Sequence, residues 1–98
     1  MQIEWETREN YEGSNSTTWF ARIERPSNLR RGDRDTTFLA GAVTHQADGT
    51  YRTSFMRALN SHFDIPRTRL HTEKGAKRRV EKYLNLWAVA GYPTGDEL

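Results

Sequence analysis

The sequence contains no cysteine and no long hydrophobic run, and both absences restrict what the chain can be. Without cysteine it can form neither a disulfide framework nor a thiolate metal site, which fits a reducing compartment. No stretch is long and apolar enough to span a bilayer. The first eight residues carry three charges and no apolar run, unlike a secretory signal. We therefore expect a cytoplasmic protein that has no membrane partner.

Catalytic and phosphate-binding patterns are also missing. The seven glycines are scattered singly and form no phosphate-binding loop. Ser61, His62 and Asp64 are close in sequence, whereas a catalytic triad needs its members on different elements with aligned geometry. His62, Asp64 and His71 match no defensible metal-ligand spacing. The expectation is a protein that is not an enzyme and that uses neither a metal nor a cofactor.

The chain is short, and its charges are unevenly distributed. A length of 98 residues fits one domain with a modest core, which we place over residues 2–91 with a flexible tail at 92–98. Fifteen lysines and arginines oppose 13 acidic residues, so the net charge is only +2. However, residues 1–12 are acidic, while residues 22–34 and 67–82 are basic. This uneven distribution of charge makes the two basic clusters candidate binding surfaces.

Residues 72–91 have a clear helical period. Thr72 suits the N-cap position, Gly91 suits a left-handed C-terminal position, and Pro93 prevents continuation of the helix. Apolar side chains recur on one stripe, and charged ones lie opposite. The apolar stripe consists of Ala76, Val80, Tyr83, Leu84, Trp87 and Ala90. The sequence thus predicts one long amphipathic helix near the C-terminus.

Four earlier segments have the composition of strands, at residues 2–8, 17–24, 36–46 and 50–58. Asp48-Gly49 between the last two predicts a two-residue hairpin turn, in which Ala47 pairs with Thr50. Residues 60–71 have no period and are expected to form a loop. The predicted fold class is α+β, an antiparallel four-stranded sheet with one C-terminal helix packed across it.

A single helix covers only one face of such a sheet, so the other face would carry exposed apolar side chains. In the predicted register, the two alternative sets are Phe38, Tyr51 and Phe55, or Leu39, Val43 and Met56. A contiguous apolar patch on a small protein usually marks an interface, so a homodimer through this face is possible. The alternative is that a neighbouring loop covers the patch.

The basic clusters admit two interpretations. In the first they contact the phosphates of nucleic acid, with affinity supplied by counterion release. In the second they form an ordinary solvated surface, in which Glu73 and Lys77 are helix neighbours and Glu81 interrupts the cations. Arg79 lies beside the apolar stripe and is expected to lay its stem along it. The candidate binding residues are Arg30, Arg31, Arg34, Arg67, Arg69, Lys74, Lys77, Arg78 and Lys82.

Three short motifs carry a resemblance to a known family. They are Thr-Trp-Phe-Ala-Arg-Ile at 18–23, Asp-Gly-Thr-Tyr-Arg-Thr-Ser-Phe at 48–55 and Thr-Glu-Lys-Gly-Ala-Lys at 72–77. Over roughly residues 17–87 the chain resembles the arm-binding domain of phage-type integrases and the related AP2-like domains. The resemblance implies that sheet residues such as Arg22 and Arg52 face a DNA groove. An additional N-terminal strand and the long insert at residues 56–71 depart from the family pattern.

The small size also resembles that of phage-encoded inhibitors of host defence, including anti-CRISPR proteins, which share no common motif. Such a protein would act in the host cytoplasm. We expect a non-catalytic binding protein that contacts nucleic acid or a nucleoprotein through the basic helix face and arginine-rich loops. The alternative is an inhibitor that blocks a host nucleoprotein or nuclease complex by protein–protein contact, through the apolar sheet face or the acidic edge strand.

Overall fold

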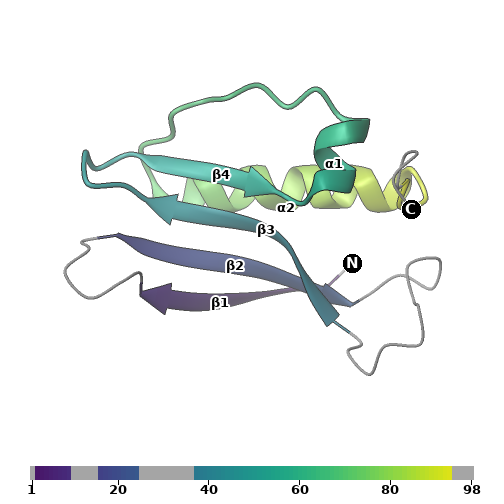
Figure 1. Ribbon diagram of the computed structural model, residues 1–98, viewed down its shortest axis with the longest axis horizontal. Coiled ribbons are helices and arrows are strands. Elements are labelled where there is room, and N and C mark those ends of the chain that lie inside the picture. The colour runs from purple at the N-terminus through teal and green to yellow at the C-terminus, as the bar shows by residue number, and fades with distance from the viewer. Residues whose placement is uncertain (1, 10–15, 25–36, 94–98) are drawn as a thin grey trace.

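A computed structural model describes residues 2–9, 16–24 and 37–93 of the chain. Within these residues the strands form one antiparallel sheet in chain order, and the long helix packs against the third and fourth strands (Figure 1). The expected α+β fold class is confirmed. The elements are β1 (Ile3–Glu9), β2 (Thr17–Glu24), β3 (Thr37–His45), β4 (Tyr51–Phe55), α1 (Arg57–His62) and α2 (Glu73–Val89).

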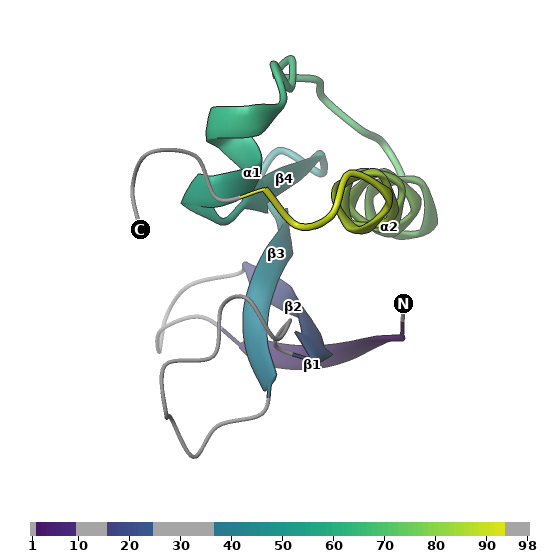
Figure 2. The same cartoon turned by 90° about the vertical axis from the view of Figure 1, so that its right-hand side faces the viewer.

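The core lies between α2 and the sheet face that α2 covers (Figure 2). The apolar stripe of the helix contributes four fully buried side chains, whereas Tyr83 is half-buried and Ala90 is exposed beyond the helix end. Those four are Ala76, Val80, Leu84 and Trp87. The sheet contributes Ala21, Ile23, Ala40 and Val43. The predicted burial of the apolar stripe is therefore confirmed for these four residues, whereas Lys77 and Glu81 on the expected outer side are half-buried.

The third strand approaches α2 very closely at Gly41. A Cβ atom at this position would lie 2.9 Å from Cγ1 of Val80 and 3.3 Å from the carbonyl oxygen of Ser54. A β-bulge next to this position shifts the pairing of β2 with β3, so that Ala21 pairs with Gly41 but Arg22 pairs with Leu39. The missing side chain lets Val80 of α2 pack directly against the backbone of β3.

Both ends of α2 follow the sequence signals. The Thr72 hydroxyl accepts a hydrogen bond from the Gly75 amide at 3.0 Å, and Gly91 adopts a φ of +85°. Past the helix, Trp87 Nε1 donates to the Pro93 carbonyl at 2.8 Å, and the Tyr92 ring packs edge-on against the Trp87 ring. Residues 92 and 93, which we expected in the tail, are thus packed, while residues 94–98 lie outside the described residues.

The predicted β3–β4 turn is wrong by one residue. Thr44 pairs with Arg52, and the Gln46 amide donates to the Thr50 carbonyl at 2.8 Å, which leaves a three-residue loop. Gly49 has a φ of +85°, as a bulged hairpin of this length requires. The Asp48 carboxylate accepts hydrogen bonds from Thr50, which lower the pKa of Asp48 and favour this longer turn.

The register change exchanges the side-chain faces of β4 relative to residues 41–45 of β3, and the bulge does the same for Phe38 and Leu39. Phe38, Tyr51 and Phe55 therefore share one face, as expected, but α2 covers that face. The second expected set does not share a face: Val43 lies on the α2 side, Met56 packs against the core at the end of β4, and Leu39 alone lies on the opposite side. The side away from α2 carries instead Glu4, Glu6, Arg8, Thr18, Phe20, Arg22, Leu39, Ala42, Thr44, Arg52 and Ser54. An apolar patch of the expected kind is absent from the described part of this face, and a homodimer remains only a prediction.

The fourth strand is shorter than expected because a short helix follows it. Strand β4 ends at Phe55, and α1 buries Ala58 and Leu59 in the core. Residues 63–72, called the α1–α2 connection below, then pass along the free edge of β4 to the start of α2 (Figure 1). Leu70 forms an isolated antiparallel bridge with Tyr51. Neither helix is long and apolar enough to cross a membrane, within the described residues.

Candidate functional site

Three of the candidate cations form one line on the outward side of α2. Lys74, Arg78 and Lys82 follow one another at four-residue spacing, and all three are exposed. Within residues 2–9, 16–24 and 37–93, none of them forms a salt bridge with a carboxylate. The Lys82 ammonium lies 5.8 Å from the centre of the Tyr83 ring. We call these three residues the outward stripe.

Glu81 does not interrupt the outward stripe, contrary to what its position in the sequence indicated. It is half-buried, and its Oε1 accepts a hydrogen bond from Trp5 Nε1 at 3.2 Å. The carboxylate is therefore directed toward β1 rather than toward the exposed cations. This contact between residues 76 positions apart leaves the outward stripe with an uncompensated positive charge.

Lys77 is separated from the other candidates by its surroundings. Its Nζ lies 3.0 Å from Glu73 Oε2, and only 23% of its side chain is exposed. The same ammonium lies 5.4 Å from the centre of the Trp5 ring and 5.2 Å from that of Trp19. A cation held by one carboxylate and two aromatic faces stabilises the contact between helix and sheet. It would have to give up these contacts to reach an external phosphate.

The α1–α2 connection positions Arg67 and Arg69 along the edge of β4. Both are exposed, and together with Arg52 they line a groove of about 830 Å³ between this edge and the connection. The described candidates therefore lie on two elements. Arg67 and Arg69 belong to the connection, whereas the outward stripe and the engaged Lys77 belong to α2. Arg30, Arg31 and Arg34 lie outside the described residues.

Arg79 ties α2 to the connection. Its Nη2 donates to the Pro66 carbonyl at 2.6 Å, and its guanidinium lies 5.5 Å from the centre of the Tyr83 ring. Its Nε is buried and makes no hydrogen bond within the described residues. This placement agrees with the expectation that the stem of Arg79 lies beside the apolar stripe. The side chain holds the connection against α2.

The side of the sheet away from α2 carries Arg22 and Arg52, the two residues that the family resemblance directs toward DNA. Arg22 Nη2 lies 3.0 Å from Glu6 Oε2, and its Nη1 donates to the Thr37 hydroxyl at 3.2 Å. Arg8 also pairs with Glu6, at 3.3 Å. The Glu6 carboxylate thus pairs with two of the three arginines on this face, and only Arg52 has no such partner. This face therefore has a weaker positive field than the outward stripe.

The shared carboxylate leads to a testable expectation about protonation. Hydrogen bonding from Arg22, with a smaller contribution from Arg8, holds the pKa of Glu6 below its ordinary value of 4.5. A nuclear magnetic resonance titration of the Glu6 carboxyl carbon should therefore have its midpoint below 4.5. The substitution Arg22→Gln should raise the midpoint more than Arg8→Gln does, and Arg52→Gln should leave it in place.

The sign of the pH effect follows from the direction of this shift. The folded-state pKa of Glu6 is lowered, so its contribution to stability is present above the unfolded-state pKa. The contribution disappears as the pH falls through the lowered value. A midpoint that does not respond to Arg22→Gln would show that the ion pair does not persist in solution.

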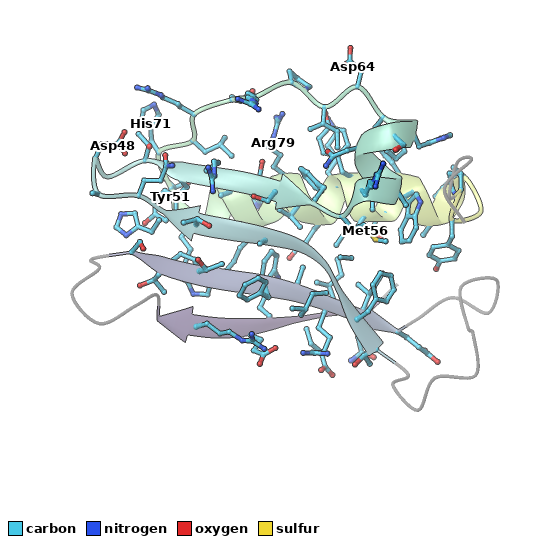
Figure 3. The ribbon with its side chains drawn as sticks, in the orientation of Figure 1. Asp48, Tyr51, Met56, Asp64, His71 and Arg79 are labelled. Carbon is cyan, nitrogen blue, oxygen red and sulfur yellow. The ribbon has the colours of Figure 1, made fainter. Side chains whose placement is uncertain are left out.

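The residues considered for catalysis or metal binding do not form a site. Asp64 and His71 lie at opposite ends of the connection (Figure 3), and both are exposed. The His62 ring packs edge-on against Phe63 at 4.7 Å between ring centres. No group of three histidine, aspartate or glutamate side chains in the described part of the chain is arranged to hold a metal ion.

The groove between the edge of β4 and the α1–α2 connection was not anticipated from the sequence. Its walls depend on α1 and on the bridge between Tyr51 and Leu70, and neither has a strong local signal. Pro66, which cannot donate a main-chain hydrogen bond, is the one residue that indicates an interrupted strand there. Compared with protein-family models, curated proteins and solved structures, the chain matches none.

Proposed function

We propose that this protein binds nucleic acid without catalysis, by contacting backbone phosphates through the outward stripe of α2. The observation that supports this proposal is the exposure of Lys74, Arg78 and Lys82 with no carboxylate partner in the described residues. Cations that need not break an internal ion pair retain their full attraction for an external phosphate. A nucleoprotein would offer the same phosphates, so it belongs to the same class of target.

The outward stripe is a better candidate than the two other basic surfaces. Lys77 is engaged by Glu73 and two tryptophan rings, and Arg22 is engaged by Glu6. Arg67 and Arg69 are exposed and precede α2 along the chain, so they are available for additional contacts. The proposal therefore assigns the principal contacts to the stripe and a secondary role to the connection.

Two matched triple variants test the proposal. The first replaces Lys74, Arg78 and Lys82 with glutamine, and the second replaces Arg8, Arg22 and Arg52, so that each removes three positive charges. Binding to a fluorescein-labelled 20-base-pair duplex is measured by anisotropy from about 50 mM salt upward. The stripe variant should bind at least tenfold more weakly at the lowest salt, and its slope of log K against log salt should be about 2.7 units shallower.

The second variant should keep most of the affinity and slope. Circular dichroism and thermal melting would establish that both variants fold, since all six positions are outside the core. Absence of duplex and single-strand binding by the parent protein at about 50 mM salt would reject the proposed function. A loss confined to the sheet variant would instead assign the contact to the face implied by the family resemblance.

A further inference from the structure

The edge of β4 has main-chain hydrogen-bonding groups that the fold leaves unused. The Tyr51 amide donates to the Leu70 carbonyl at 2.8 Å, and the Leu70 amide donates to the Tyr51 carbonyl at 3.3 Å. On the other side of β4, the Met56 amide donates to the Ala40 carbonyl at 3.0 Å. The main-chain groups of alternate residues in a strand point to opposite edges. The amide and carbonyl groups of Thr53 and Phe55 therefore point to the same edge of β4 as those of Tyr51.

Only part of that edge has partners. The Phe55 carbonyl accepts a hydrogen bond from Asn60 Nδ2 at 3.0 Å. The amide and carbonyl of Thr53 and the amide of Phe55 have no partner among the described residues. These three groups face the groove of about 830 Å³ that separates β4 from the connection. An edge with unpaired groups is a template for another strand.

The connection begins to pair with this edge and then leaves it. Continuing the bridge between Leu70 and Tyr51 would place Thr68 opposite Thr53 and Pro66 opposite Phe55. Pro66 has no amide hydrogen, and its carbonyl oxygen already accepts the hydrogen bond from Arg79 Nη2. The chain therefore cannot complete its own ladder, and the groove is the space in which the missing strand would lie.

The groove also has a definite charge. Arg52, Arg67 and Arg69 line it, and none of its lining residues is an aspartate or glutamate. Half-buried Ile65 and Phe55 provide apolar surface beside the arginines. An occupant that satisfies the main-chain groups must be extended, and one that satisfies the arginines must be acidic.

We propose that this groove binds an extended acidic peptide segment of a partner protein, which adds a strand to the edge of β4. Main-chain hydrogen bonds at Thr53 and Phe55 hold the segment, and its carboxylates contact Arg52, Arg67 and Arg69. Specificity then comes from charge and from the alternation of side chains, as in other cases of strand addition. The inference is independent of nucleic-acid binding by α2, because it uses main-chain groups of β4.

The experiment uses the full chain, labelled with ¹⁵N, and a blocked eight-residue peptide of alternating threonine and glutamate. The Thr53 and Phe55 amide signals should shift as peptide is added to about millimolar concentration, the weak end of protein–peptide affinity. The same peptide with lysine in place of glutamate should produce no shift at these amides. Arg67→Gln combined with Arg69→Gln should weaken binding at least fivefold.

Two N-methylated forms of the acidic peptide test whether the contact is a strand. One form is methylated at the odd-numbered nitrogens and the other at the even-numbered ones, so that they carry equal charge. Strand addition uses only one of these sets, so the two peptides should differ at least tenfold in affinity. Equal affinities would show attraction by charge alone and would overturn the proposal.

A main-chain variant of the protein provides an independent check. Thr53→Pro removes an amide that points away from β3, at a position where an edge strand tolerates proline. If the variant folds, it should lose peptide binding and keep duplex binding; unchanged peptide binding would overturn the proposal. If it does not fold, the N-methylated peptides decide between strand addition and attraction by charge alone.

Inorganic phosphate and duplex serve as controls for anion binding. Shifts of the Thr53 and Phe55 amide signals by either of them would show a general anion site and would also overturn the proposal.

Discussion

Truncation of Trp87 to alanine is expected to destabilise the protein by about 3–5 kcal/mol. The side chain is completely buried, the largest in the described core, and lies between α2 and the sheet. Its ring packs edge-on against Phe38 at 6.5 Å and against Tyr92 at 5.1 Å between ring centres. A small domain has only about 5–15 kcal/mol of stability in total, so this one change should leave the fold marginal.

Urea denaturation followed by circular dichroism measures this loss. The matched control is Leu86→Ala on the preceding position of α2, where the side chain is 43% exposed, and it should change stability by less than about 1 kcal/mol. Trp87→Phe should lie between the two, because it keeps an aromatic ring but removes the Nε1 donor to Pro93. Equal costs for Trp87→Ala and Leu86→Ala would contradict the packing of α2 described above.

The long helix could be predicted from the sequence because its signals are local. Thr72, Gly91 and the apolar stripe act over a few residues, so their meaning does not depend on the rest of the fold. The four strands and their antiparallel order were also accessible, since each segment has strand composition and strands that are consecutive in sequence usually pair with each other. The fold class follows from these elements alone.

The β3–β4 register was not accessible in the same way. Asp48-Gly49 is compatible with a two-residue turn and with the three-residue loop that forms, and the two differ by one position. The hydrogen bonds from Thr50 to the Asp48 side chain favour the longer loop. Since side chains of a strand alternate, this single position reassigned every residue of β4 to the opposite face relative to β3.

Helix α1 and the groove depend on contacts between distant residues. A six-residue helix has little intrinsic stability and here lacks a side-chain N-cap, so burial of Ala58 and Leu59 must hold it. The candidate cations show the same limit. Whether a lysine of α2 is exposed or engaged depends on Trp5 and Trp19, which lie more than 50 positions earlier in the chain.

Replacement of Gly41 by valine is expected to cost about 3 kcal/mol, at the upper end of the usual range for overpacking. The new Cβ alone would lie 2.9 Å from Val80 Cγ1 and 3.3 Å from the Ser54 carbonyl oxygen. Valine is otherwise favoured over glycine in strands, so intrinsic propensity predicts the opposite sign. Ala42→Val, at the next position and on the side away from α2, is the matched control and should be neutral or stabilising.

The compensating change at Val80 makes this test specific to the helix–sheet contact. Val80→Ala removes the methyl group nearest to Gly41 and should cost about 2 kcal/mol alone, because it leaves a cavity in the core. The double variant removes two of the carbon atoms that face the valine side chain introduced at position 41, so its loss should be at least about 1 kcal/mol smaller than the sum of the single losses. Strict additivity in urea denaturation would mean that β3 and α2 do not meet at this point. The contact with the Ser54 backbone remains in the double variant, so recovery should be partial and the double variant should stay less stable than the parent protein.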